Sequence, residues 1–370
     1  MSIQSAHRSS DENTRPHSGA ASSREADLGS APIGSLLFKL ALPAIAAQII
    51  NVLYNMVDRM YIGHIPDIGP SALTGVGVTM PIIMCISAFA ALAAMGGAPQ
   101  ASILMGKGDK ASAEKVLGNC TFMLTVISLV LTALFLGFGR PILLMFGASE
   151  KTILYAWNYM KIYVCGTFFV QMALGLNAFI NAQGYAKTGM ITVAIGALCN
   201  IILDPIFIFG LDLGISGAAL ATALSQCISF GILFFQSLLR KDCVHLKPGK
   251  ITLSLALYGE ILHGGIPSLC RQGIASIATA ALNLAANPFG DAAIAALSIV
   301  SRYMMFIGSA MIGFGQGFQP VCGFNFGAKR YDRVLESFWF CVKVSVVFLA
   351  VLAVGSFVGA PQIMRAFRKE

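Results

Sequence analysis

The chain contains two apolar stretches that repeat one another, and this internal duplication constrains its architecture more than any single residue does. Residues 34–48 read GSLLFKLALPAIAAQ and residues 259–272 read GEILHGGIPSLCRQ, and in both a proline precedes a glutamine by five positions. At nearly the same spacing, the segment 106–110 has a counterpart in 327–330. A duplicated apolar sequence predicts two similar helical lobes related by an internal axis.

The composition places the chain in a membrane. Of its 370 residues 56% are hydrophobic and 11% are charged, and the mean hydropathy is +0.75, whereas globular domains have roughly 25% charged residues. The predicted fold class is an all-α integral membrane protein with two homologous helical lobes, a six-helix repeat followed by an incomplete repeat of about three helices. Because a spanning helix needs about 20 mostly apolar residues, the sequence predicts nine of them, at residues 36–58, 72–97, 117–139, 155–180, 187–210, 214–239, 258–284, 289–318 and 335–359.

These helices divide the chain into four parts. Residues 1–33 are rich in Ser, Arg, Glu and Asp and lack an apolar run, which predicts a disordered cytoplasmic tail rather than a cleaved signal peptide. Residues 34–240 form the N-lobe with helices one to six, 241–257 a cytoplasmic linker, and 258–370 a partial C-lobe with helices seven to nine. Since the second repeat lacks three helices that the first contains, we expect the sequence to be a fragment or the product of a disrupted gene.

Basic residues gather in alternate loops and thereby predict the orientation of the chain. The opposite loops are poorer in basic residues, with Arg140 and Lys151 only in the loop after helix three. The N-terminus is therefore predicted to be cytoplasmic and the protein to be multi-pass in the plasma (inner) membrane. No nucleic-acid partner is expected, because the basic residues are not collected on one face. The loops after helices two, four, six and eight carry Lys107, Lys110, Lys115, Lys187, Arg240, Lys241, Lys247, Lys250, Lys329, Arg330 and Arg333.

The sequence has no motif of a soluble enzyme or of an ATP-driven pump. It contains no GxSxG, no HExxH and no Walker A lysine. Its nine cysteines include no CxxC pair, and its five histidines lie far from any cysteine or carboxylate cluster with the spacing of metal ligands. We therefore expect no catalytic residues, no cofactor and no resident metal, apart from H⁺ or Na⁺ as a coupling ion.

The first predicted helix carries a polar stripe. Gln48, Asn51, Asn55 and Asp58 follow one another at steps of three, four and three, so they share one face of an α-helix. Polar groups in lipid need partners or water, so the stripe is expected to face the bundle interior or a cavity. Each part of the stripe has an alternative that stays open: Gln48 and Asn51 only form hydrogen bonds between helices, and Asp58 is an interfacial carboxylate beside Arg59.

The seventh predicted helix repeats this stripe without a carboxylate. The position of Asp58 corresponds to Leu282 or Asn283, so ionisable chemistry is expected in the first repeat alone. Arg271 is a basic residue within this helix and should reach an interface or pair with an acid that the sequence does not identify. The polar residues of the stripe are Ser268, Gln272, Ser276, Thr279 and Asn283.

The fifth predicted helix ends in a second polar group. Asn200 and Asp204 share a face at a spacing of four, and Pro205 removes a backbone donor, which leaves the carbonyl of Ile201 free. A carbonyl, an amide and a carboxylate close together suit Na⁺ or an exchangeable proton; the alternative is a helix-terminal carboxylate in water. Helices four and six add side chains that either line the same cavity or pack between helices: Asn177, Asn181, Thr222, Ser225, Gln226 and Ser229.

Four segments carry the most specific pattern of the chain. They read LPAIAAQ (42–48), NMVDRMYIG (55–63), PQASILMGKGD (99–109) and CNIILDPIFIFGLDLGISGAALATALSQ (199–226). Together they resemble the multidrug and toxic compound extrusion (MATE) transporters, most closely their MepA-like branch, over about residues 34–370. The resemblance implies two six-helix lobes related by a pseudo-twofold axis along the membrane normal. It also implies a site for the coupling cation, formed by Asp58, Asn177, Asn200, Asp204 and Thr222, with Tyr159 as a looser match.

The resemblance further implies secondary active efflux. Cationic amphiphilic compounds would be exported in antiport with H⁺ or Na⁺ through alternating access, and Asp58 and Asp204 would bind the coupling cation. The expected partners are the lipid bilayer and small cationic or amphiphilic substrates, and we expect a monomer, although the sequence does not determine the oligomeric state. Two alternatives stay open: a lipid-linked oligosaccharide flippase of a related fold, or an inactive truncated membrane protein.

Overall fold

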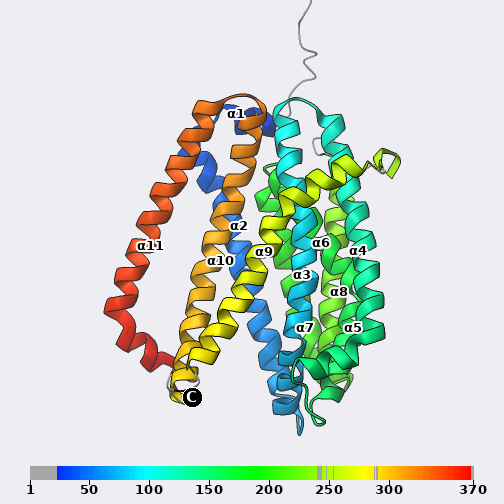
Figure 1. The fold of residues 1–370 in the computed structure, drawn as a ribbon. Coiled ribbons are helices and arrows are strands. Elements are labelled where there is room, and N and C mark those ends of the chain that lie inside the picture. Colours follow the sequence, from blue (N-terminus) through cyan, green and yellow to red (C-terminus); the bar gives the residue numbers. More distant parts are fainter. Residues whose placement is uncertain are drawn as a thin grey trace, which may run out of the picture.

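All regular structure in the described part of the chain is helical (Figure 1). The computed structural model describes residues 23–239, 244–246, 248–252, 254–286, 288 and 291–367. Within these residues the predicted all-α fold is confirmed. The elements are α1 (Ser23–Ser30), α2 (Ile33–Gly63), α3 (Gly69–Gly106), α4 (Lys110–Met145), α5 (Ile153–Cys165), α6 (Thr167–Ala182), α7 (Ala186–Pro205), η1 (Ile206–Gly210), α8 (Ile215–Leu239), η2 (Pro248–Lys250), α9 (Leu255–Ala286), α10 (Asp291–Gly327) and α11 (Tyr331–Phe367).

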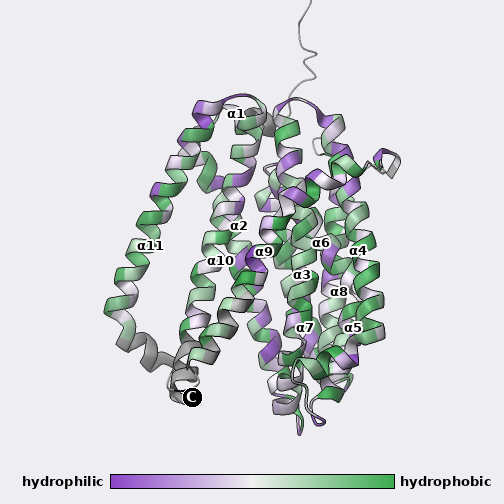
Figure 2. Ribbon diagram, in the orientation of Figure 1, coloured by the Kyte–Doolittle hydropathy of each residue, from purple (hydrophilic) through white to green (hydrophobic). Residues whose placement is uncertain are grey.

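Six helices of the described residues are long and apolar enough to cross a membrane, and the pair α5 and α6 makes up to seven. The six are α2, α3, α4, α7 together with η1, α8 and α11. Hydrophobic residues cover much of the lengths of these helices, and hydrophilic ones gather mostly toward the ends of the bundle (Figure 2). Nine spans were predicted; α9 and α10 are helical where predicted, but they are not among the helices that meet this test.

The tail predicted over residues 1–33 contains a short helix, α1, so the expectation of disorder is wrong for Ser23–Ser30. Leu28 of this helix is buried in an apolar cluster with residues of α2 and α10. That burial explains why a polar sequence becomes ordered, since the helix is stabilised by packing rather than by its own composition. Residues 1–22 lie outside the described part of the chain.

The fourth predicted span is broken in the middle. α5 and α6 meet at Gly166 and are bent by 54°. A Cβ added to Gly166 would lie 2.9 Å from the Cβ of Ala223 on α8, so only glycine allows this close approach. The bend packs α6 against α3, α4 and α8, and α5 against the other ends of the same helices.

The two repeats meet through glycines at one end of the bundle. α9 packs against α3, and α10 packs against α2 and α3. Gly265 of α9 approaches the backbone of Leu92, and Gly317 of α10 approaches that of Ala41, so closely that a Cβ would overlap the opposing chain. The start of α2, the end of α3, the start of α9 and the end of α10 all lie at the end of the bundle that carries α1 (Figure 1), termed the α1 end. The interlobe seam is therefore closed at the α1 end.

The described part of the interlobe linker is bound to the N-lobe. Lys250 Nζ lies 2.5 Å from the Glu114 carboxylate of α4. Asn119 Oδ1 accepts from the Thr252 amide at 3.1 Å, and Asn119 Nδ2 donates to Thr252 Oγ1 at 3.3 Å. These contacts fix the chain on α4 just before it enters α9.

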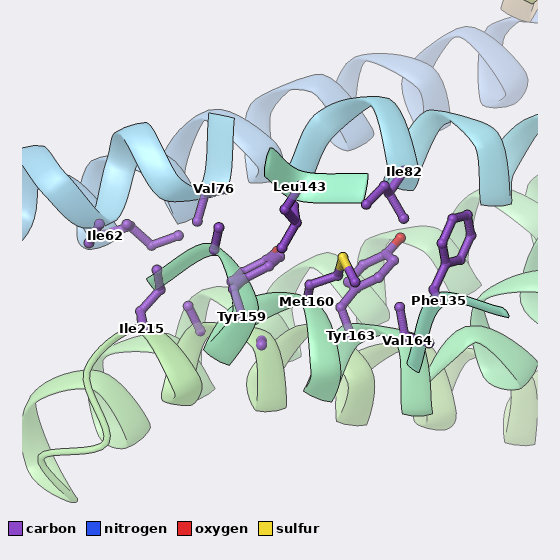
Figure 3. Packing of buried hydrophobic residues seen from close by; sticks show 14 of the residues in the cluster. Ile62, Val76, Ile82, Phe135, Leu143, Tyr159, Met160, Tyr163, Val164 and Ile215 are labelled. Atoms are coloured by element: carbon purple, nitrogen blue, oxygen red, sulfur yellow. The ribbon is translucent and has the colours of Figure 1, made fainter. Parts of the chain in front are cut away.

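An apolar cluster fills the N-lobe at the end away from α1 (Figure 3). It joins Ile62 of α2, Val76 and Ile82 of α3, and the α5 residues Tyr159 and Tyr163, which stack at a centroid distance of 6.1 Å. Both tyrosines also line the cavity described below. The cluster thus packs behind the part of the cavity wall that these two tyrosines form.

Candidate functional site

A cavity of about 380 Å³ lies within the N-lobe and reaches α10. Its walls come from α2, α3, α5, α6, α7, α8 and α10, so six helices of the first repeat and one of the second contribute to it. The polar stripe of the first predicted helix faces this space, because Gln48, Asn51, Asn55 and Asp58 all line it. The stripe therefore points inward, as polar groups in a membrane protein require.

Two buried carboxyl groups lie near one another, and one of them lines this cavity. Asp58 of α2 is 7% exposed and Asp204 of α7 is 0% exposed. Asp58 lines the cavity, and Asp204 lies close enough to Asp58 for the two carboxyl groups to interact. Asp58 Oδ1 and Asp204 Oδ2 nevertheless have no hydrogen-bond partner among the described residues. A buried carboxylate needs a cation or a proton, so the pair is a candidate binding place for one.

The nearest basic residue does not neutralise the pair. Arg59 follows Asp58 and acts on it electrostatically, but its Nη2 donates to Met80 Sδ at 2.9 Å. No ion pair to Asp58 or Asp204 is found among the described residues. The site is therefore acidic, with one arginine at its edge.

Asn200 ties Asp204 to the adjoining helix. Its Nδ2 donates to Asp204 Oδ1 and to Thr222 Oγ1, both at 3.4 Å, and its Oδ1 is buried without a described partner. Asn200 and Thr222 line the cavity with Tyr159. The structure thus brings together five of the six residues predicted for the cation site: Asp58, Asp204, Asn200, Thr222 and Tyr159.

The local structure around Asp204 follows from Pro205. α7 ends at this proline and continues as the π-helix η1, as expected where a backbone donor is missing. The predicted free carbonyl of Ile201 stays a prediction. The change of helix type at the carboxyl end of α7 nonetheless lies directly after Asp204.

Asn177, the sixth predicted member, is engaged elsewhere. Its Nδ2 donates to the Gly189 carbonyl at 3.1 Å, and its Oδ1 accepts from Asn181 at 2.8 Å. Gly189 precedes Asn200 by eleven residues on α7, which corresponds to roughly 16 Å along the helix. Asn177 and Asn181 line the cavity, but one of their described hydrogen bonds lies within α6 and the other joins α6 to α7.

The stripe of the seventh predicted helix does not reach the cavity in the described residues. Gln272 of α9 is half-buried and is not among the lining residues, and Arg271 is exposed. The side chains of Ser276, Thr279 and Asn283 lie outside the described part of the structure. Within the described residues, the cavity therefore does not share the symmetry that the repeated sequence predicts.

Sequence reasoning missed the contribution of α10. Gln316 and Gln319 line the cavity, and Gln48 Nε2 donates to Gln316 Oε1 at 3.2 Å. Tyr54 and Tyr163 were missed as well. The signal for the glutamines was present, since two amides three residues apart in an apolar helix share a face, whereas the tyrosines could not be told from packing residues.

No group of three or more His, Cys, Asp or Glu side chains that could hold a metal ion is found among the described residues. A Na⁺ site would therefore use two carboxylates with amide, hydroxyl and backbone oxygens, which is the ligand set that hard cations prefer.

The fold and the cavity define a class of protein. Helices of two repeats enclose polar groups and a buried acid pair within an apolar bundle, which is the construction of a multi-pass membrane transporter. The chain belongs to the MatE family, whose profile matches residues 43–206 and 267–370. The resemblance to MATE transporters is thereby confirmed, and the protein is a transporter and not an enzyme.

Curated relatives and solved structures agree with this assignment. The multidrug export protein MepA of Staphylococcus haemolyticus is 29% identical over 321 residues, which cover 85% of this chain and 68% of the relative. MepA of Staphylococcus aureus (strain NCTC 8325) is 27% identical over 331 residues, covering 87% and 71%. A crystal structure of MATE in the bent conformation superposes with a TM-score of 0.87 at 23% identity, over 94% of this chain and 77% of that one.

A second solved structure is a MOP superfamily transporter from Pyrococcus furiosus, for which a reversed polarity of the binding pocket suggests a different function. It has a TM-score of 0.87 at 23% identity, over 95% of this chain and 77% of that one. At this identity the likeness shows the fold alone. The polarity of this chain's own pocket must therefore be judged from its own residues.

Proposed function

We propose that the protein exports cationic amphiphilic compounds in antiport with H⁺ or Na⁺. The relatives named multidrug export proteins support the class of substrate. The site supports a positive charge on the substrate, because the two carboxyl groups of Asp58 and Asp204 outnumber the single guanidinium group of Arg59. This acid pair, buried and with carboxyl oxygens lacking described partners, is the observation that carries the proposal.

The mechanism follows from competition for the acid pair. With Asp58 and Asp204 both deprotonated, two negative charges lie in a buried space and attract a cationic substrate. Binding of H⁺ or Na⁺ removes that attraction, so the substrate leaves. A ligand shifts a conformational equilibrium only through its different affinity for the two states, and occupancy of the acid pair provides that difference.

The arrangement of the lobes supports a state open to the outside. The seam is closed at the α1 end by glycine contacts between α9 and α3 and between α10 and α2. Under the proposed orientation, with the N-terminus cytoplasmic, that closed end faces the cytoplasm. Export then requires the seam to open at the α1 end and to close at the other.

Transport by purified protein in proteoliposomes tests the proposal. Ethidium uptake into inside-out vesicles would be followed after imposing a pH gradient, a Na⁺ gradient or neither. Uptake driven by one gradient and abolished by the matching ionophore supports antiport and identifies the ion. Uptake with neither gradient, or no uptake with either, contradicts it.

The flippase alternative predicts a different outcome of the same preparation. Lipid-linked oligosaccharide would cross the bilayer without an ion gradient, and ethidium would not move. Since a flippase for anionic lipid-linked sugars favours a basic cavity, the acidic pair argues against it. The absence of movement of both substrates would agree with an inactive protein.

A further inference from the structure

A short helix at the start of the described chain lies across the junction of the two lobes. α1 packs against α10, and the chain then turns into α2 of the N-lobe. Leu28 is 2% exposed, and a Cβ added at Gly184, in the turn between α6 and α7, would lie 3.4 Å from Leu28 Cδ1. α1 therefore rests on the N-lobe through Leu28 and also contacts the C-lobe through α10.

Side chains of the C-lobe bind the carbonyl end of α1. Cations and amide donors at the last carbonyls of a helix stabilise it, because those carbonyls lack partners within the helix and carry partial negative charge. The hydrogen bonds run from Asn325 Nδ2 to the Leu28 carbonyl (3.1 Å), from Arg330 Nη1 to the Gly29 carbonyl and from Arg333 Nη2 to the Ala31 carbonyl (2.7 Å).

Two of these donors are also bonded to one another within the C-lobe. Asn325 is 0% exposed, and its Oδ1 accepts from Arg333 Nε at 3.2 Å. The glycine at position 29 leaves room for these hydrogen bonds, since a Cβ there would lie 3.0 Å from Arg330 Nη1 and 3.3 Å from Phe324 Cε1. The contact therefore joins the backbone at the end of α1 to side chains of which two also bond to one another.

The position of these bonds gives them a consequence for motion. They lie at the α1 end, where glycine contacts close the interlobe seam (Figure 1). α1 is continuous with α2, and Lys39 of α2 pairs with Asp27 of α1 at 3.4 Å. If the lobes separate at this end while α1 stays with the N-lobe, the hydrogen bonds to Asn325, Arg330 and Arg333 must break.

We propose that α1 is a latch that stabilises the conformation closed at the α1 end, a role that rests on the proposed alternating access. Loosening the latch shifts the population toward the state open at that end, because it removes bonds that only the closed state makes. A helix that only capped the bundle would contribute to folding without changing the balance between the two open states.

Distances between spin labels test the latch directly. Labels at Lys187→Cys, at the start of α7, and Glu336→Cys, on α11, place one probe on each lobe near the α1 end, in a protein whose native cysteines are replaced. The latch variants are Arg330→Ala with Arg333→Ala, and separately Gly29→Leu, which keeps both arginines. Lys329→Gln is the matched control, because it removes one charge from the same loop and leaves both arginines in place.

The expected result is a longer-distance population that rises at least several-fold in both latch variants and stays at the wild-type level in Lys329→Gln. Unchanged distance distributions in the variants overturn the latch. If the double arginine variant fails to fold, the distance distribution of Gly29→Leu alone tests the latch. The distance measurement does not depend on transport. A shifted distance distribution without efflux supports the latch and contradicts the proposed export. Efflux with unchanged distance distributions contradicts the latch alone.

Discussion

The two repeats have similar backbone structures but different side chains. The loops between α3 and α4 and between α10 and α11 are the smallest example. Both loops end a helix in the same way. Gly108 and Lys329 have positive φ angles of 78° and 59°, and the next residues, Asp109 and Arg330, each donate their amide to the carbonyl five residues earlier. This is the Schellman ending of a helix. At the corresponding next position, Asp109 caps α4 whereas Arg330 binds α1.

The same divergence holds for the whole repeats. In the first, polar groups of α2, α7 and α8 converge on a buried acid pair. In the second, α10 adds glutamines to the cavity, and the apolar window of α11 has no buried residue. A duplication therefore preserves helix positions and turn geometry, which depend on backbone requirements, while the side chains that bind ligands change independently.

The largest expected effect comes from removing the charge that only the first repeat has. Asp204→Asn keeps the shape and the hydrogen bond from Asn200 but removes the charge that the coupling cation binds. We expect gradient-driven ethidium transport to fall by roughly two orders of magnitude, measured in proteoliposomes at equal protein content.

Asp212→Asn is the matched control for that variant. Asp212 is an exposed residue in the turn after η1 with a φ of 53°, a conformation that asparagine also tolerates. It should transport like the wild type. Equal activity of Asp204→Asn and Asp212→Asn would show that the charge of Asp204 is not needed for coupling.

The second effect concerns the seam where the repeats meet. Gly265→Leu on α9 places a side chain against the backbone of Leu92, and overpacking of this kind costs about 1–3 kcal/mol. Gly273 lies on the same helix with nothing within 4 Å of an added Cβ, so Gly273→Leu should be tolerated. The thermal unfolding midpoint in detergent measures both, and similar midpoints for the two variants would contradict close contact of the repeats.

Much of this fold could be predicted from hydropathy and from the duplication, since nine apolar segments were expected and helices occupy each of them. The break at Gly166 was missed, because its cause is the approach of Ala223 from a helix distant in sequence. α1 was missed for a similar reason: its order depends on Leu28 and on arginines about 300 residues away.

The candidate site divides in the same way. The stripe of α2 and the pair Asn200 and Asp204 were visible as helical spacing, which is a local property. Which amides join them is a matter of packing, so Asn177 was grouped with Asp204 although its hydrogen bonds lie with Gly189 and Asn181. Gln316 lies outside the duplicated stripe, so the repeat did not indicate that it would join the cavity.

A smaller effect is expected at the duplicated loops. Asp109 accepts from the Ser112 amide at 3.0 Å, and losing such a cap costs about 1 kcal/mol, so Asp109→Ala should lower the unfolding midpoint slightly. The hydrogen bonds from Ser112 hold the pKa of Asp109 below its ordinary 3.8. The stabilisation is therefore complete above that value and is lost as the pH falls through the lowered pKa.

The pH dependence also provides the control for this cap. The difference in midpoint between wild type and Asp109→Ala should shrink at low pH, whereas Asp109→Asn, which caps without a charge, should lie near the wild type with no such trend. A difference that is constant with pH would mean that the carboxylate does not act as the cap.

The smallest effect is expected where the two repeats share a polar contact inside the cavity. Gln48 of α2 and Gln316 of α10 form a hydrogen bond of 3.2 Å, and such interhelical bonds contribute about 0.6 kcal/mol in membrane proteins. A double-mutant cycle with Gln48→Ala and Gln316→Ala should return a coupling energy of that size in unfolding measurements.

The cycle Gln48→Ala with Gln319→Ala is the control, since Gln319 lines the cavity on the same helix and no bond to Gln48 is described. Equal coupling in both cycles would mean that the amides act only through the shape of the cavity. Coupling confined to Gln316 would show that a residue without a counterpart in the duplicated stripe has joined the site from the second repeat.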